Sequence, residues 1–197
     1  TGFWSDLEDQ ASKLIPSGSL HPGKALVLGA GGAARAVVYA LCLHGWQVTL
    51  LSRRPAQAQQ VAEDLARFTP APIALAQPLD EAATQLAGLP FDLLVNTTPL
   101  GMQPHAADSP WLENIPLPPG AWIYDLVYNP RETCLLRQAK RQGHPATNGL
   151  GMLVHQAARS FLLWTGLPAE MMPLVRNAMH TASLPDQENH ENQLTAP

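Results

Sequence analysis

The segment ALVLGAGGAARA (residues 25–36) joins an apolar run to a cluster of glycines and to the start of a helical pattern. Its first part, Ala25 to Leu28, is apolar at every position, which is typical of a strand buried on both faces of a parallel sheet. A cluster of glycines follows, and residues 33–44 then carry apolar side chains at helical spacing. We therefore expect a strand, a glycine turn and a helix in that order.

The same alternation of strand and helix continues along the chain. We expect strands at 25–28, 48–51, 73–76, 91–95, 122–126 and 145–147, and helices at 33–44, 56–68, 79–86, 132–142 and from 149 onward. This order predicts an α/β fold with a doubly wound parallel sheet, in which the wholly apolar runs 25–28 and 93–95 lie at the centre. Prolines crowd residues 99–119, which predicts an irregular loop over one edge of the cleft.

The two ends of the chain differ from this pattern. A helix is expected at residues 3–15, and its apolar face has no assigned sheet partner; the face consists of Phe3, Leu7, Ala11 and Leu14. We therefore predict that residues 1–20 form a linking helix that docks onto another domain. Residues 21–183 form the main domain in this interpretation, and the polar residues 184–197 are expected to be disordered.

Composition excludes several classes of protein. The chain has 197 residues, of which 46% are hydrophobic and 14% charged, and a net charge of -4. These values predict a soluble, globular protein without a membrane span or a basic surface for nucleic acid. We expect it in the cytoplasm. Cys42 and Cys134 lack metal-ligand spacing and are expected to be small buried residues, and the scattered histidines predict no metal site.

The glycines of the turn stand in a phosphate-binding pattern. Residues 29–34 match G-x-G-x-x-A, directly after a predicted strand and at the start of a predicted helix. Gly29 permits the tight turn, Gly31 lets the backbone approach a pyrophosphate, and Ala34 allows close packing of helix on strand. Free N–H groups at the helix start would hold the anion. The pattern predicts a Rossmann-like dinucleotide site; the alternative is a glycine turn that binds nothing.

The end of the second strand indicates which dinucleotide is bound. An NAD-binding domain would place Asp or Glu there to bond the ribose 2′-hydroxyl, whereas this chain reads Ser52, Arg53 and Arg54. Two guanidiniums can form charge-assisted hydrogen bonds to a 2′-phosphate. After discounting for exposure to water, we expect a roughly 5- to 150-fold preference for NADP(H) over NAD(H). The alternative is a pair of solvated arginines on a turn.

Further polar residues are expected on the far side of the cleft. Residues 96–102 and 124–130 follow the fourth and fifth strands and offer Asn, Thr and Tyr side chains as neutral hydrogen-bonding groups. Ordinary turn chemistry would explain them equally well. The helix from residue 149 carries apolar residues at helical spacing, and we expect it to bury Leu150, Leu153, Ala157, Phe161 and Trp164.

Five segments together resemble one enzyme family, the NADP-dependent shikimate dehydrogenases. In chain order they are VLGAGGAARAV, LLSRRPAQA, LVNTTPLGM, YDLVYNP and NGLGMLVHQAARSFLLWTG, and the resemblance covers residues 1 to about 166. It implies reversible hydride transfer between NADPH and 3-dehydroshikimate, giving shikimate. The last segment is the most specific, because a general dinucleotide-binding domain has no reason to carry it.

The resemblance also implies roles for individual residues. It assigns cofactor contacts to Gly29, Ala30, Gly31, Gly32, Ala33, Ser52, Arg53, Arg54, Thr98, Leu126 and Gly149, and substrate contacts to Tyr128 and Gln156. The family usually reads Asn-Arg-Thr where this chain has residues 52–54, with a further basic residue where this chain has Gln57. How the two arginines divide the phosphate is therefore left open.

The catalytic Lys and Asp of the family belong to an amino-terminal substrate domain, and no lysine here (Lys13, Lys24 or Lys140) matches that role. Because reduction of a ketone needs a positioned proton donor, we expect this chain to bind the cofactor without turnover. Such a domain is the expected partner. Two alternatives stay open, a standalone NADP-binding or sensing module and a related reductase acting on quinate or another polyol acid.

Overall fold

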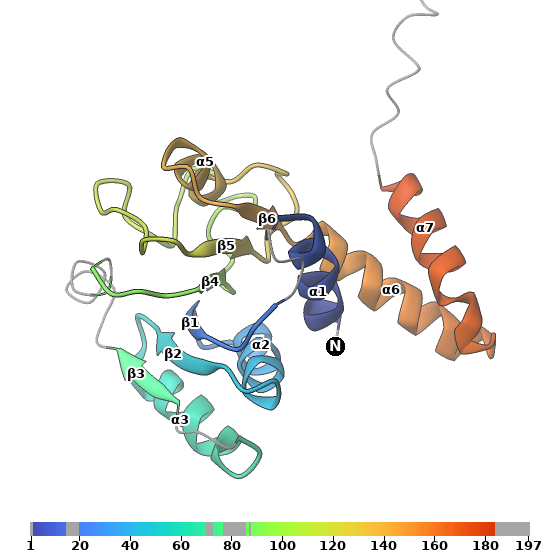
Figure 1. Cartoon of the computed structure of the whole chain (residues 1–197), viewed down its shortest axis with the longest axis horizontal. Coiled ribbons are helices and arrows are strands. Elements are labelled where there is room, and N and C mark those ends of the chain that lie inside the picture. The colour runs from blue at the N-terminus through green and yellow to red at the C-terminus, as the bar shows by residue number, and fades with distance from the viewer. Residues whose placement is uncertain (1, 15–19, 70–72, 77–85, 87, 184–197) are drawn as a thin grey trace, which may run out of the picture. The chain divides into compact units, whose positions relative to one another are not determined.

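The computed structural model of the chain describes residues 2–14, 20–69, 73–76, 86 and 88–183 (Figure 1). The chain divides into two compact units, residues 1–152 and 153–197. The predicted division into residues 1–20, 21–183 and 184–197 uses other boundaries and stays a prediction. The tail and most of the expected helix 79–86 lie outside the described residues.

The first unit contains the sheet. Its strands are β1 (Lys24–Leu28), β2 (Gln47–Leu51), β3 (Ala74–Ala76), β4 (Leu93–Asn96), β5 (Trp122–Asp125) and β6 (Ala146–Asn148). The described strands are all parallel and lie in the order β3-β2-β1-β4-β5-β6, which is the order of a dinucleotide-binding sheet. In register, Leu26 pairs with Thr49 on one side and with Leu94 on the other. The doubly wound fold and the central place of the two wholly apolar strands are confirmed.

Helices cover both faces of this sheet (Figure 1). They are α1 (Gly2–Leu14), α2 (Gly32–Leu43), α3 (Pro55–Ala66) and α5 (Cys134–Arg141). Local signals start two of them: Pro55 occupies the first turn of α3, and the Thr133 hydroxyl accepts a hydrogen bond from the Leu136 N–H of α5 at 3.3 Å.

Each face of the sheet has its own apolar core, and β1 contributes to both. Ala25 and Val27 belong to the core beneath α1, α2 and α3, whereas Leu26 and Leu28 belong to the core beneath α5. A strand whose side chains alternate between two cores must be apolar throughout, which is the physical reason for the unbroken run in the sequence.

The prediction that the apolar face of α1 docks onto another domain is wrong for most of that face. Phe3, Leu7 and Ala11 are buried in the same core as α2, and only Leu14 is exposed. The sequence order assigned no partner because α1 precedes the sheet, yet it covers a sheet face of its own chain. A linking role for residues 1–20 stays a prediction.

The helix α6 (Leu150–Thr165) begins in the first unit and continues into the second, where a 3₁₀ turn (Ala169–Met171) and α7 (Met172–Ala182) follow. The predicted buried face of α6 is wrong. The buried residues are Val154, Ala158 and Leu162, whereas the predicted Phe161 is 40% and Trp164 86% exposed. Because α6 is apolar on two adjacent stripes, its periodicity alone cannot choose between them.

Candidate functional site

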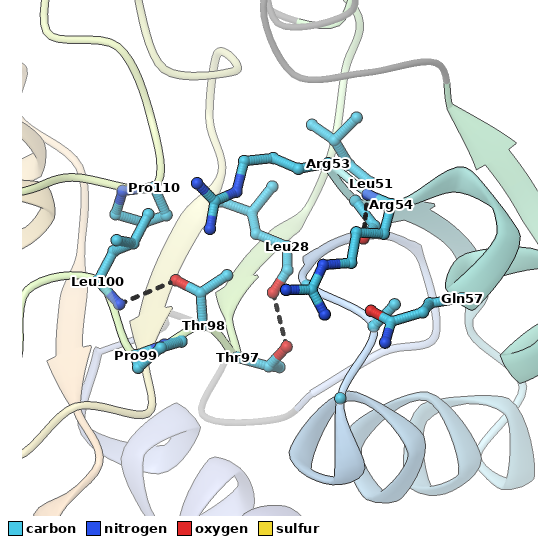
Figure 2. Close-up of a pocket in the computed structure, with 14 residues that line it drawn as sticks. Leu28, Leu51, Arg53, Arg54, Gln57, Thr97, Thr98, Pro99, Leu100 and Pro110 are labelled. Atoms are coloured by element: carbon cyan, nitrogen blue, oxygen red, sulfur yellow. Dashed lines mark hydrogen bonds between the residues drawn. The ribbon is translucent and has the colours of Figure 1, made fainter.

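A cavity of about 260 Å³ opens where the carboxyl ends of β1, β2 and β4 meet (Figure 2). It is lined by Leu28, Gly29, Ala30, Gly31, Leu51, Ser52, Arg53, Arg54, Gln57, Thr97, Thr98, Pro99, Leu100 and Pro110. In open parallel sheets ligands bind at this edge, beside the point where the strand order reverses. The described lining residues include two arginines and no carboxylate.

The glycine turn after β1 has the geometry that the sequence predicts. Gly29 has a φ of +106°, which L side chains rarely adopt, and a Cβ there would lie 2.7 Å from the Thr97 hydroxyl. The Gly29 N–H also donates to the Leu51 carbonyl at 2.8 Å, which joins the turn to the end of β2. Glycine is therefore required at this position by the fold itself.

Gly31 and Gly32, which follow in the same turn, leave open space beside the start of α2. A Cβ at Gly31 or Gly32 would meet no described atom within 4 Å, and no described side chain caps the first turn of α2. The first N–H groups of a helix lack partners within the helix and carry a partial positive charge. The start of α2 at the cavity is therefore suited to an anionic group such as a phosphate.

The segment after β2 supplies the positive charge of the cavity. The Ser52 side chain is buried and its hydroxyl accepts a hydrogen bond from the Arg54 N–H at 3.1 Å, while Arg53 and Arg54 are exposed. In Figure 2 the guanidinium of Arg54 points to the Gln57 side of the cavity, and that of Arg53 points toward the opposite wall. The third arginine of the region, Arg35, instead forms an ion pair with Asp64 that joins α2 to α3.

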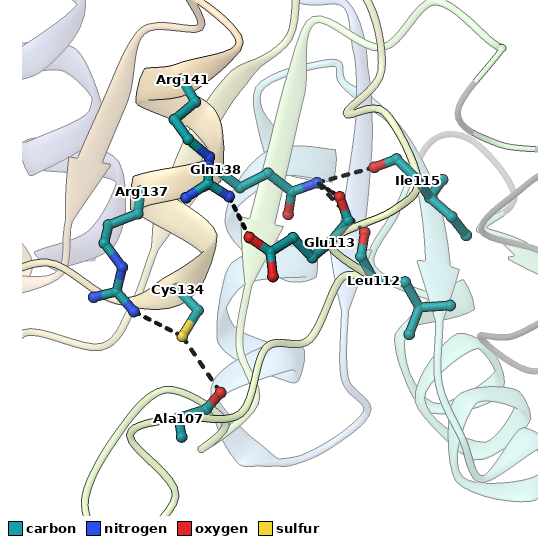
Figure 3. A network of polar contacts seen from close by, with 8 residues as sticks. All are labelled: Ala107, Leu112, Glu113, Ile115, Cys134, Arg137, Gln138 and Arg141. Carbon is teal, nitrogen blue, oxygen red and sulfur yellow. Dashed lines mark hydrogen bonds and ion pairs between the residues drawn. The ribbon is translucent and has the colours of Figure 1, made fainter.

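The opposite wall is a long loop that is held in place by α5 (Figure 3). The buried Gln138 side chain donates to the Ile115 carbonyl at 2.9 Å, and Arg141 forms an ion pair with Glu113 at 2.6 Å. The half-buried Cys134 thiol contacts the Ala107 carbonyl at 3.4 Å, so this cysteine has a polar partner that the sequence did not predict. These contacts fix the loop that carries Pro110 to the cavity.

A network of buried polar side chains at the ends of β4 and β5 orients one residue that lines the cavity. The Asn96 amide donates to Asp125 at 2.8 Å, and its oxygen accepts from the Thr98 N–H at 2.9 Å and the Thr98 hydroxyl at 2.7 Å. Asp125 also accepts hydrogen bonds from the Val127 N–H at 3.0 Å and the Thr133 hydroxyl at 2.6 Å. Thr98, a predicted cofactor contact, is therefore oriented by groups on both β4 and β5.

Burial raises the pKa of Asp125 from 3.8 to about 6, against the opposing effect of its hydrogen bonds. The folded protein therefore binds a proton at Asp125 more tightly than the unfolded chain does. This proton adds to the free energy of unfolding fully below about pH 4, and the addition is lost as the pH rises through about 6. Its largest value is on the order of 3 kcal/mol.

Urea unfolding of wild type and Asp125→Asn between pH 4 and 7 should show a difference in the free energy of unfolding that changes with pH in this window. Parallel curves would contradict the raised pKa.

The structure brings together part of the predicted site. Gly29, Ala30, Gly31, Ser52, Arg53, Arg54 and Thr98 line the cavity, whereas Gly32 and Ala33 form the start of α2 without lining it. Leu126 and Gly149 lie outside the cavity. Their backbones are in close contact, as shown by the overlap that a Cβ at Gly149 would have with the Leu126 carbonyl. Tyr128 is exposed after β5, and Gln156 is exposed on α6 in the second unit.

The cavity also contains residues to which the sequence assigned no individual contact. Thr97, Pro99 and Leu100 belong to the segment 96–102, which was expected at the cleft as a whole because it follows the fourth strand, and the structure places these three in the lining beside Thr98. The cluster of prolines predicted a loop over one edge of the cleft, but it did not indicate that Pro110 is the residue of the distant part of that loop that lines the cavity.

Two further properties concern the described residues. No described helix is long and apolar enough to cross a membrane. Within the described part of the chain, no group of three or more His, Cys, Asp or Glu residues is arranged to hold a metal ion.

Comparisons with known proteins agree with the fold and with the resemblance. A family model described as the shikimate 5′-dehydrogenase C-terminal domain matches residues 149–171. The NADP(+) shikimate dehydrogenase of Moorella thermoacetica is 40% identical over 193 residues, which cover 93% of this chain and 61% of that protein. The chain thus spans about three fifths of the length of this relative.

Solved structures show the same relationship. The shikimate 5-dehydrogenase of Thermus thermophilus, solved with NADP(H) and shikimate, has a TM-score of 0.67 and 36% identity over 90% of this chain and 60% of its own. The quinate dehydrogenase of Corynebacterium glutamicum, solved with NAD, has a TM-score of 0.70 and 30% identity over 91% and 61%. By sequence and by fold, the chain is therefore related to the shikimate dehydrogenases, and the part of those enzymes that it matches is their carboxy-terminal, NADP-binding region.

Proposed function

We propose that the cavity binds NADP(H) in preference to NAD(H). The observation that carries this proposal is one cavity that combines the uncapped start of α2 with the side chains of Arg53 and Arg54. The pyrophosphate lies against the first turn of α2 and the adenosine 2′-phosphate beside the two guanidiniums. The Gln57 side chain adds a neutral donor on the same side.

The space beside Gly31 gives a first test of this fit. Gly31 has a φ of -88°, which alanine also adopts, so Gly31→Ala should leave the free energy of unfolding nearly unchanged. The added methyl group would occupy the space through which the pyrophosphate approaches the backbone, and NADPH affinity should fall roughly tenfold. Calorimetric titration together with urea unfolding checks both parts. An unchanged affinity would place the phosphates elsewhere.

We further propose that the chain acts as the cofactor-binding part of a shikimate dehydrogenase, which converts 3-dehydroshikimate, NADPH and a proton into shikimate and NADP+. The bound nicotinamide supplies the hydride in that reaction. Tyr128 and Gln156 contact the substrate in this proposal, and Leu126 and Gly149 lie at the nicotinamide. Coverage of three fifths of the relatives' length supports a further substrate domain that carries the proton donor.

A turnover assay tests the wider proposal. Residues 1–197 alone should bind NADPH and show no measurable oxidation of shikimate with NADP+, because the proton-transferring groups are supplied by the substrate domain. Joining the chain to the polypeptide encoded directly upstream should produce turnover. Shikimate oxidation at a normal rate by the chain alone would refute the assignment of the proton donor to another domain.

A quinate-type reductase is the second candidate. It rests on the likeness to the quinate dehydrogenase of C. glutamicum, whose TM-score of 0.70 equals that of the shikimate 5-dehydrogenase of Listeria monocytogenes. That protein was solved with NAD, whereas Arg53 and Arg54 favour NADP(H) in this chain. Comparison of kcat/KM for shikimate and quinate in the two-domain protein decides between the candidates.

A further inference from the structure

Two buried polar side chains lie outside the cavity and have no part in the proposed function so far. Asp6 of α1 is 2% exposed and Tyr124 of β5 is fully buried. The Tyr124 hydroxyl donates a short hydrogen bond to one carboxylate oxygen of Asp6, and the Gln10 amide donates to the other at 3.2 Å. The ring of Phe3 packs against the edge of Tyr124 at 5.2 Å between centroids. The pair joins the first helix to an inner strand of the sheet.

The Asp6 carboxylate also presses against the first turn of α6. A Cβ at Gly151 would overlap the carboxylate, so glycine is the residue that allows this approach. On the other side, the Gly149 N–H donates to the Val127 carbonyl at 3.2 Å. Residues 149–151 are therefore held between α1 and the chain that leaves β5.

The chemical properties of Asp6 and Tyr124 suit a pair that holds neighbouring residues in one position. A buried carboxylate is costly unless it is hydrogen-bonded, and a negative charge is favourable beside the start of a helix. Burial, followed by the charge and hydrogen bond of Asp6, raises the pKa of Tyr124 above its usual range. The phenol therefore stays protonated and remains the donor.

We propose that Asp6 and Tyr124 are positioning residues that hold residues 149–151 in the conformation that receives the nicotinamide half of the cofactor. This inference rests on the proposed function, because that function assigns Gly149 and Leu126 to the nicotinamide. The adenosine half lies at the cavity beside Arg53 and Arg54, and the described residues that line this cavity do not include Asp6 or Tyr124. Loss of the pair should therefore affect one half of the cofactor site only.

Two ligands separate the halves of the site. NADPH carries both halves, whereas adenosine 2′,5′-bisphosphate carries the 2′-phosphate and adenosine without the nicotinamide. In Tyr124→Phe, the Kd for NADPH should rise ~3- to 10-fold, as expected for a lost positioned hydrogen bond, while the Kd for the bisphosphate stays within about twofold of wild type. Hydrogen exchange at the amides of residues 149–152 should become faster.

Two other variants complete the experiment. Asp6→Asn changes the other partner at constant volume and should shift NADPH affinity in the same direction by a smaller factor, because its amide oxygen can still accept from Tyr124. Tyr39→Phe removes the hydroxyl of a half-buried tyrosine on α2 and should leave both affinities unchanged.

The possible results are distinct. Weaker NADPH binding with normal bisphosphate binding supports the positioning role. Equal weakening of both ligands, or no change in either despite lower stability, would overturn it, because the pair would then support only the fold. If wild type bound neither ligand, the proposed function itself would fail, and the assigned role of the pair with it.

Discussion

Simultaneous replacement of Arg53 and Arg54 by alanine is expected to weaken NADPH binding roughly 5- to 150-fold and to leave NADH binding nearly unchanged. The two cofactors differ only in the 2′-phosphate, and these side chains are the cationic groups among the described residues that line the cavity. The range is wide because both side chains are exposed and water screens their interaction with the phosphate. Titration of each variant with both cofactors measures the ratio of affinities directly.

A charge-matched control separates local contacts from the general effect of net charge. Lys13→Ala combined with Lys24→Ala removes two positive charges from exposed positions outside the cavity, and it should leave the ratio of NADPH to NADH affinity as in wild type. Equal losses for both cofactors in the arginine variant would refute the assignment of the 2′-phosphate to residues 53 and 54. If the double variant loses affinity for NADPH alone, the single variants Arg53→Ala and Arg54→Ala show how much of that loss each guanidinium accounts for.

Gly149→Ala is expected to cause the largest loss of stability among the single substitutions considered. The added Cβ would overlap the Leu126 carbonyl, and the contact is with backbone, so no side chain can rotate away. Relief requires a shift of the chain between β6 and α6 or of the chain that leaves β5. We expect a cost of about 1–3 kcal/mol, seen as a Tm lower by roughly 2–10 °C in thermal unfolding.

Gly32→Ala is the matched control for this substitution. Gly32 is the first residue of α2, and a Cβ there would meet no described atom within 4 Å. Alanine is the better helix former, so the stability of this variant should equal or slightly exceed that of wild type. If Gly149→Ala unfolded at the wild-type temperature, the close approach of residues 126 and 149 would not be a fixed feature of the fold.

Much of this architecture could be predicted from short segments. The apolar run from Ala25 to Leu28 indicated a strand with two buried faces, and the structure places it between β2 and β4 with one core on each side. The turn at Gly29 and the placement of Arg53 and Arg54 at the same edge of the sheet followed from strand and helix order alone. The parallel arrangement brings the ends of β1 and β2 together wherever the rest of the chain lies.

The wrong predictions concern which face of a helix is buried and what covers it, rather than which helices and strands form. The α1 face was expected to need another domain, yet Phe3 and Leu7 are buried against their own sheet. The buried stripe of α6 includes Val154 and Ala158 instead of the predicted Phe161, because adjacent apolar stripes give the same periodicity. In both cases the pattern identifies an apolar surface but contains no information about what covers it.

The amino-acid sequence by itself determined the order of strands and helices, the glycine turn, and the cationic end of β2, because each depends on residues that are neighbours in the chain. The tertiary structure alone decided which proline of the loop reaches the cavity, namely Pro110, and that Asp6 meets Tyr124, which is 118 positions away. Such contacts form only when separate elements pack, and burial then selects the side chains that can satisfy one another away from water.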